Sequence, residues 1–203
     1  MYVPAAFRIT DERTIRDFIE QNLFGIVVTQ SESGPGATHL PMLFDHGENE
    51  NGTLTGHIAR ANPQRKAFNG STVLAIFQGP HGYISPSLYD GDRNVPTWDY
   101  TAVHVYGRAS VVDDAGDSAA IVRRLSKRME QTRENPWNVD TLPADYVATM
   151  VNGIVAFRIA IERVEAQFKL SQNRSVAERR RIVSDLAQSG NETERALSPL
   201  IPL

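Results

Sequence analysis

Apolar and polar residues follow two distinct periods along this chain, and these periods predict its elements. Ile15, Phe18 and Ile19 recur at helical spacing, which predicts a short amphipathic helix over residues 11–22. Short β-branched or strictly alternating runs predict strands instead. Strands are expected at 24–30, 38–45, 53–60, 72–77, 101–112 and 154–161, and further helices at 63–69, 118–131, 144–153 and 175–188.

The order of these elements predicts the fold class. Strands mostly follow one another, with helices inserted between them and at the end. This order favours an antiparallel barrel or sheet with flanking helices over a doubly wound parallel sheet. The chain is therefore predicted to be mainly β with flanking helices (α+β). Because it has no internal repeat and no interdomain linker, we expect a single domain over residues 1–190, followed by a mobile or partner-docked tail at 191–203.

Composition narrows the class of protein. The chain has 203 residues, of which 41% are hydrophobic and 22% charged, as in ordinary soluble globular proteins. A net charge of −3 gives no global attraction to nucleic acid. The absence of cysteine excludes disulfides and thiolate chemistry. No apolar run approaches the length of a membrane span and no signal-peptide layout is present, so a cytoplasmic location without a membrane partner is the default expectation.

The stretch 79–107 is the richest in chemistry. It carries two histidines, four tyrosines and one of the two tryptophans. Long connections are usually functional or disordered, and disordered segments are poor in aromatic residues. We interpret this stretch as an ordered loop between two strands and as the first place to expect a ligand.

Two motifs within and before this stretch are candidate polar contacts. Asn62 is a suitable N-cap with Pro63 at the first helical position, and a helix N-terminus attracts anions. Arg60 could add a bidentate phosphate contact, although a capped surface helix with a solvated arginine explains the same residues. In the second motif, alternation along an extended segment would point four side chains to one side. They could bind phosphate or the edge of a ring, or they could only form hydrogen bonds within a loop. These four are His81, Tyr83, Ser85 and Ser87.

Two further motifs suggest a planar ligand. Thr97, Trp98 and Tyr100, with His104 on the following strand, could cover a heterocycle or could plug a barrel end. Late in the chain, a lysine could bind a phosphate and two amide side chains could bond to the edge of a heterocycle. The same segment could also simply lead into the following helix. This last motif consists of Lys169, Ser171, Gln172 and Asn173.

Other classes of site find little support. His39, His57, His81 and His104 are scattered, with no HxH or HExxH spacing, so no metal site is expected. No glycine-rich nucleotide loop and no GxSxG elbow is present. The arginines at 174 and 179–181 are interpreted as a solvated helix side rather than a nucleic-acid contact.

An ordered set of short segments resembles a known family. The segments are MYVPAAF, THLP (38–41), GHIARANPQ (56–64), VLAIFQGPHGYISPS (73–87), VPTWDYTAVHVYG (95–107), ENPW (134–137) and KLSQN (169–173). Together they resemble the PaiB-like family of FMN-binding negative transcriptional regulators. The chain departs from the family pattern at Leu88 and Phe168, where the family tends to carry Trp, and at Asp99, where it tends to carry Asn.

The resemblance implies a fold, a cofactor and partners. The implied fold is an antiparallel split β-barrel of the pyridoxamine-phosphate oxidase type, in a homodimer with FMN at the interface. The family name implies negative regulation of transcription, through DNA directly or through a regulatory protein partner. Since no helix-turn-helix is evident, that role rests on the family name alone. The FMN contacts it implies are His57, Arg60, Asn62, His81, Tyr83, Ser85, Ser87, Thr97, Trp98, Tyr100, His104, Lys169, Ser171, Gln172 and Asn173.

Two alternatives stay open at this point. A split-barrel flavoprotein could be an FMN-dependent oxidoreductase that uses NAD(P)H, with His81 or His104 handling protons. Related barrels can also accept haem, so a haem-binding or haem-degrading protein with His57 or His81 near the iron is the weaker alternative.

Overall fold

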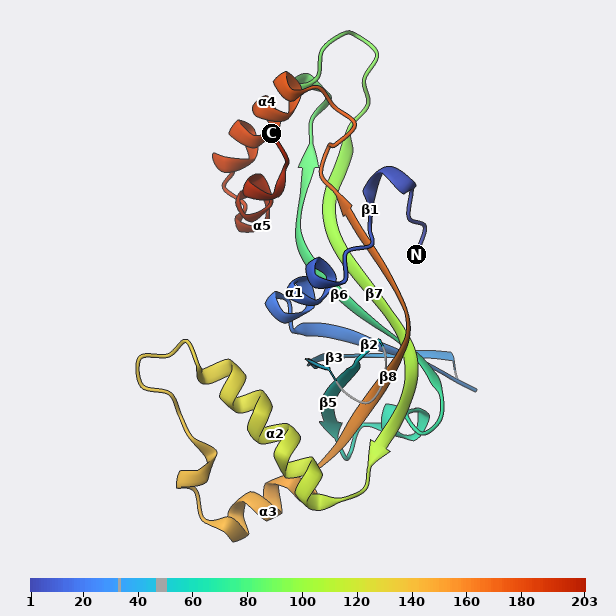
Figure 1. Cartoon of the computed structure of the whole chain (residues 1–203), viewed down its shortest axis with the longest axis vertical. Helices are drawn as coiled ribbons and strands as arrows, with labels where there is room; N and C mark the ends of the chain where they lie inside the picture. Colours follow the sequence, from blue (N-terminus) through green and yellow to red (C-terminus); the bar gives the residue numbers. More distant parts are fainter. Residues whose placement is uncertain (33, 47–50) are drawn as a thin grey trace. The chain divides into compact units, whose positions relative to one another are not determined.

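Antiparallel strands dominate the computed structural model, which describes residues 1–32, 34–46 and 51–203 (Figure 1). The strands are β1 (Arg8–Ile9), β2 (Phe24–Ser31), β3 (Gly34–Pro41), β4 (Leu43–Asp45), β5 (Thr53–Ala59), β6 (Thr72–Ile84), β7 (Thr97–Val112) and β8 (Ile154–Lys169). The helices are α1 (Glu12–Gln21), α2 (Ala115–Glu130), α3 (Ala144–Asn152), α4 (Val176–Ala187) and α5 (Glu192–Leu197). The sheet order is β3-β2-β6-β7-β8-β5-β4, with β1 paired to β8.

The chain divides into two compact units. The first unit comprises Met1–Phe18, Gln78–His104 and Glu165–Leu203, and the second comprises Ile19–Phe77 and Val105–Val164. Strands β6, β7 and β8 run through both units without a break. The expectation of a single domain therefore stays a prediction.

The second unit is a curved antiparallel sheet with α2 packed on it. Its β2 pairs with β3 and β6, and its β5 pairs with β4 and β8. Gly56 on β5 lies so close to the end of β3 that an added Cβ would stand 3.1 Å from the Pro41 carbonyl oxygen. Because β3 and β5 are not neighbours in the sheet order, this approach shows the sheet curling back on itself, as a barrel requires. The core under α2 consists of Leu23, Leu43, Val112, Ile121, Leu125 and Ala156.

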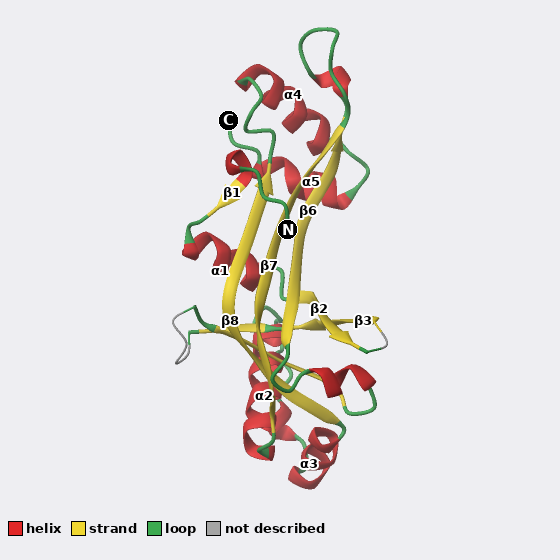
Figure 2. Cartoon of the chain, turned by 90° about the vertical axis from the view of Figure 1, so that its right-hand side faces the viewer, coloured by secondary structure: helices red, strands yellow, loops and turns green. Residues whose placement is uncertain are grey.

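The first unit packs α4 and α5 against its own strands (Figure 2). Gly82 on β6 is needed here, since an added Cβ would meet Leu186 and Leu197 at 3.3 Å and the Glu194 side chain at 2.9 Å. Ser175 and Glu178 form the capping box that starts α4, as predicted from the sequence. The apolar core of this unit consists of Ile84, Tyr89, Leu170, Ile182, Leu186, Leu197 and Ile201.

The main helices and the mainly antiparallel β class are confirmed, but several boundaries differ. The loop expected across 79–107 is much shorter, because β6 continues to Ile84 and β7 begins at Thr97. Pro80 concealed the continuation of β6, since proline lacks the N–H that a strand ladder uses. The last strand extends from Ile154 to Lys169 rather than ending at 161, and the helix expected at 63–69 is a 3-10 helix at Pro63–Ala67.

The C-terminal segment also differs from expectation. Residues 191–203, expected as a mobile or partner-docked tail, contain α5 and a following 3-10 turn. Leu197 and Ile201 are buried against α4, so apolar packing rather than any periodic pattern orders this segment. Among the described residues, no helix is both long enough and apolar enough to cross a membrane.

Candidate functional site

An exposed cluster of aromatic rings lies on β6 and β7 in the first unit. The Trp98 ring centroid stands 6.3 Å from that of His81 and 6.2 Å from that of Tyr83. Alternation along β7 turns Trp98 outward while Asp99 and Thr101 are fully buried. Trp98 is 54% exposed and Tyr83 is 43% exposed. Adjacent exposed aromatic side chains of this size mark a surface suited to binding, and we call His81, Tyr83 and Trp98 the aromatic face.

A buried polar group lies on the neighbouring strand of the same unit. The Gln167 side chain on β8 is buried and donates from Nε2 to the Tyr100 hydroxyl at 2.7 Å. Its Oε1 accepts no hydrogen bond from any residue that the structure describes. A buried acceptor without a donor is costly. Gln167 Oε1 is therefore an unsatisfied acceptor inside the first unit, and the sequence alone did not single this residue out.

A buried carboxylate, Asp99, and a partly buried lysine, Lys169, form an ion pair next to Trp98. The Lys169 ammonium lies 3.4 Å from Asp99 Oδ1 and 2.5 Å from Thr97 Oγ1, and it also donates to the Trp98 carbonyl. Ser171 donates to Asp99 Oδ2 at 2.5 Å from a left-handed conformation with φ of 55°. Burial raises the pKa of Asp99, while the Ser171 hydrogen bond and the Lys169 charge oppose that rise. Lys169 thus contacts the side chains on both sides of Trp98 as well as the Trp98 carbonyl.

The remaining candidates in the first unit have mostly local partners. Ser85 caps the short turn after β6, and its hydroxyl lies 2.8 Å from that of Ser87. Gln172 closes the turn after β8 by accepting from the Leu170 N–H at 2.7 Å, and Asn173 is exposed. His104 is half-buried, and burial chiefly lowers its pKa. All of the predicted contacts on β6, β7 and the KLSQN segment thus fall in the first unit.

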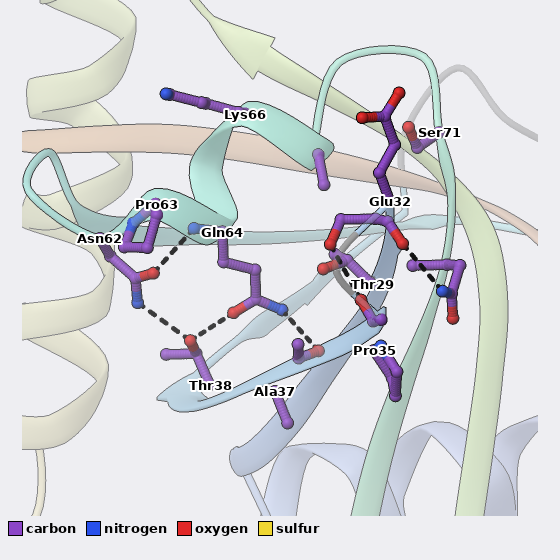
Figure 3. A pocket seen from close by; sticks show the side chains of 15 residues that line it. Thr29, Glu32, Pro35, Ala37, Thr38, Asn62, Pro63, Gln64, Lys66 and Ser71 are labelled. Carbon is purple, nitrogen blue, oxygen red and sulfur yellow. Dashed lines mark hydrogen bonds between the residues drawn. The ribbon is translucent and has the colours of Figure 1, made fainter.

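In the second unit, Asn62 belongs to a closed hydrogen-bond network beside a cavity of about 790 Å³ (Figure 3). Asn62 accepts from the Gln64 N–H at 2.9 Å and donates to Thr38 Oγ1 at 3.0 Å. Thr38 bonds to Gln64 Oε1, and Gln64 Nε2 donates to the carbonyls of Val27 and Gly36. These side chains join the 3-10 helix to β2 and β3. Their polar atoms are largely used within the chain.

Arg60 and His57 also lie in the second unit. Three donors of Arg60 bind consecutive carbonyls at the end of α3: its N–H bonds Gly153 O at 2.9 Å, Nε bonds Asn152 O at 2.6 Å and Nη2 bonds Ile154 O at 2.8 Å. Arg60 therefore caps the C-terminus of α3. His57 is half-buried, and burial lowers its pKa. Within the described ranges, no group of three or more His, Asp or Glu side chains could hold a metal ion.

Solved structures share this fold at low sequence identity. An FAD and heme binding protein from Mycobacterium smegmatis superimposes with a TM-score of 0.62 at 13% identity, covering 80% of this chain and 73% of that one. The flavocytochrome Anf3 from Azotobacter vinelandii gives a TM-score of 0.60 at 13% identity, covering 80% of this chain and 69% of that one. These similarities, with the antiparallel pairing above, confirm the predicted split-barrel fold class.

Sequence relatives show the family. The chain is 38% identical to "Protease synthase and sporulation protein PAI 2" of Bacillus subtilis over 99% of this chain and 96% of that protein. A family model described as "Putative FMN-binding domain" matches residues 1–163. The PaiB-like resemblance is thereby confirmed, and the chain belongs to this FMN-binding-domain family.

Proposed function

We propose that this protein binds FMN, with the flavin ring held on the aromatic face of the first unit. The observation that carries the proposal is the half-exposed indole of Trp98 between His81 and Tyr83. A flat ring system needs such a surface on one side and a few polar groups at its edge. Membership of the FMN-binding-domain family supports the choice of ligand.

Different residues of the first unit would make different contacts with the ring or hold those contacts in position. Trp98 and Tyr83 supply apolar contact area for the ring. Asp99 and Lys169 keep the Trp98 backbone in place. FMN, when bound, supplies one- and two-electron redox chemistry that side chains lack. The imidazole of His81, next to Trp98, could hydrogen-bond to the edge of the bound ring.

We further propose that a second copy of the chain covers the aromatic face. Tyr83 and Trp98 leave apolar surface exposed beside the proposed ligand, and a homodimer would bury it. Light scattering should then give twice the chain mass of 22.5 kDa. A monomer at micromolar concentration would contradict the proposed dimer but would not contradict FMN binding.

Any role in transcription is proposed to act through a protein partner rather than direct DNA contact. Arg181 on α4 is bound to Asp90 at 2.7 Å and to the Leu88 carbonyl at 2.8 Å. Arg174 stacks 3.6 Å from the centre of the Tyr89 ring. Two of the four arginines at 174 and 179–181 are thus used within the chain, and a net charge of −3 gives no compensating attraction to phosphates. Salt-sensitive retardation of promoter DNA by the pure protein would contradict this proposal.

The cofactor is tested by loading and titration. Purified protein is heated to release any chromophore, and the apo chain is titrated with FMN, riboflavin and haemin in parallel. The proposal expects saturable binding of FMN at one molecule per chain. Saturable binding of haemin with no response to either flavin would overturn it in favour of a haem protein. Oxidation of NAD(P)H by the FMN-loaded chain above the rate of free FMN would add an oxidoreductase activity.

A further inference from the structure

The strand that carries two rings of the aromatic face has helices packed against its reverse side. His81 and Tyr83 on β6 alternate with Gly82 and Ile84, so the two pairs of residues lie on opposite sides of the strand. Tyr83 is exposed, whereas Gly82 and Ile84 are buried. Gly82 lies against α5, and Ile84 belongs to the apolar core that α4 and α5 build (Figure 2). Within the first unit, α4 and α5 therefore support the aromatic face from behind.

Glu194 on α5 bonds directly to the backbone of β6. Its Oε1 accepts a hydrogen bond from the Tyr83 N–H at 3.3 Å. Its Oε2 accepts from the Ser189 hydroxyl, whose oxygen in turn accepts from the Asn191 N–H at 3.0 Å. The carboxylate is thus held in place by the turn between α4 and α5. Since hydrogen bonds to carboxylates are stronger than those to neutral acceptors, Glu194 connects this turn to the strand at Tyr83.

The backbone of β6 at Tyr83 needs a partner other than a strand. In the sheet order β6 lies between β2 and β7, and among the described residues β2 pairs with β6 only at 74–76. Beyond this pairing, one edge of β6 is open to other partners. Backbone N–H and C=O groups on such an edge need hydrogen bonds from elsewhere. At Tyr83 the Glu194 carboxylate supplies this bond.

We propose that Glu194 is a positioning residue for the aromatic face, acting through Tyr83. Its bond to the Tyr83 N–H holds this part of β6, and with it the Tyr83 ring, in the orientation that a flat ligand contacts. A segment that is ordered before binding loses less conformational entropy when the ligand arrives. Glu194 thereby raises ligand affinity without touching the ligand. This inference rests on the proposed function, in which Tyr83 contacts the flavin ring.

The direct test of the bond is hydrogen exchange of the Tyr83 amide, followed by NMR on the full chain without ligand. Glu194→Met keeps the length of the side chain but removes the acceptor, and it should accelerate exchange about tenfold. Glu194→Gln keeps an acceptor oxygen and should retain most of the protection. Glu192→Met is the matched control, because Glu192 is exposed on the same short helix; it should change exchange less than twofold.

The amide of Ile182 serves as the internal reference, since Ile182 on α4 is fully buried. If Glu194→Met only destabilised the unit, exchange at Ile182 and at Tyr83 would rise together, and the positioning role would be overturned. Equal exchange of the Tyr83 amide in the wild type and in Glu194→Met would overturn it as well.

The effect on binding is tested by titration with FMN and with riboflavin. Glu194→Met should weaken both by about fivefold, because the Tyr83 segment must then be ordered during binding. In a Tyr83→Ala background, the same substitution should change affinity less than twofold, since both residues act through one ring. Losses that multiply in the double variant, or a change confined to FMN, would overturn the proposal.

The two proposals fail in different ways. If the wild type binds neither FMN nor riboflavin, the flavin proposal is overturned, and the exchange rates still decide whether Glu194 fixes Tyr83. If the wild type binds FMN and Glu194→Met binds it equally well, the positioning role alone is overturned.

Discussion

The aromatic face of the first unit and the Asn62–Gln64 network of the second unit differ in how far their side chains are exposed and hydrogen-bonded. In the first unit, Trp98 is 54% exposed and Gln167 Oε1 has no hydrogen-bond donor within the described part of the chain. In the second unit, Asn62, Gln64 and Thr38 bond to one another and to backbone carbonyls. The contrast teaches that a polar segment can serve the fold alone. Uncovered surface and unsatisfied atoms are the better guide to a ligand.

The largest effect should come from the ion pair behind the aromatic face. Lys169→Met leaves the Asp99 carboxylate buried without its cation, because Asp99 is fully buried. We expect the free energy of unfolding to fall by about 4 kcal/mol, measured by urea denaturation. The double variant with Asp99→Asn should recover most of this loss. A loss below about 1 kcal/mol for the single variant would show that the pair is not buried as described.

A smaller effect is expected at the network of the second unit. Gln64→Ala removes the bonds to Thr38, Val27 and Gly36 and should lower the free energy of unfolding by about 2 kcal/mol. The affinity for FMN should stay within twofold of the wild type, because these atoms are used within the chain. A tenfold loss of FMN affinity in a folded Gln64→Ala variant would mean that the contrast between the two regions is wrong.

The smallest effect is a pH dependence at Asp99. Burial raises the pKa of this carboxyl in the folded chain, so the folded state binds its proton more tightly than the unfolded state does. The stability of the wild type relative to Asp99→Asn should therefore fall as pH rises from about 4 through the raised pKa of Asp99. Tyr89 also lies near Asp99, and burial raises the pKa of Tyr89, so its hydroxyl stays protonated in this range. A difference that is flat with pH would contradict the raised pKa.

Local patterns were sufficient for some parts of the fold. The helical period at Ile15 and Phe18 and the capping box at Ser175 and Glu178 predicted α1 and α4, because these signals lie within a few residues of one another. The continuation of β6 past Pro80 could not be predicted, since it depends on neighbouring strands that are distant in sequence. The order of residues 191–203 likewise depends on burial against α4.

The candidate site was predictable in its residue types but not in their roles. The aromatic residues at 83 and 98 were singled out from composition, and the structure brings them together with His81. Lys169 was expected to contact a phosphate, but its ammonium lies against Asp99. This pairing could not be predicted, because it depends on the end of β8 lying beside the start of β7. Gln167 carried no local signal, because an orphaned acceptor is visible only once burial is known.

The most direct test compares two tryptophans that are similarly exposed. Trp98 and Trp137 are 54% and 49% exposed, so replacing either by alanine removes a comparable side chain. We expect Trp98→Ala to weaken FMN binding by about five- to 150-fold, since stacking on an aromatic ring contributes about 1–3 kcal/mol per base, whereas Trp137→Ala should change it less than twofold. Equal affinities of both variants for FMN would contradict the placement of the flavin on the aromatic face.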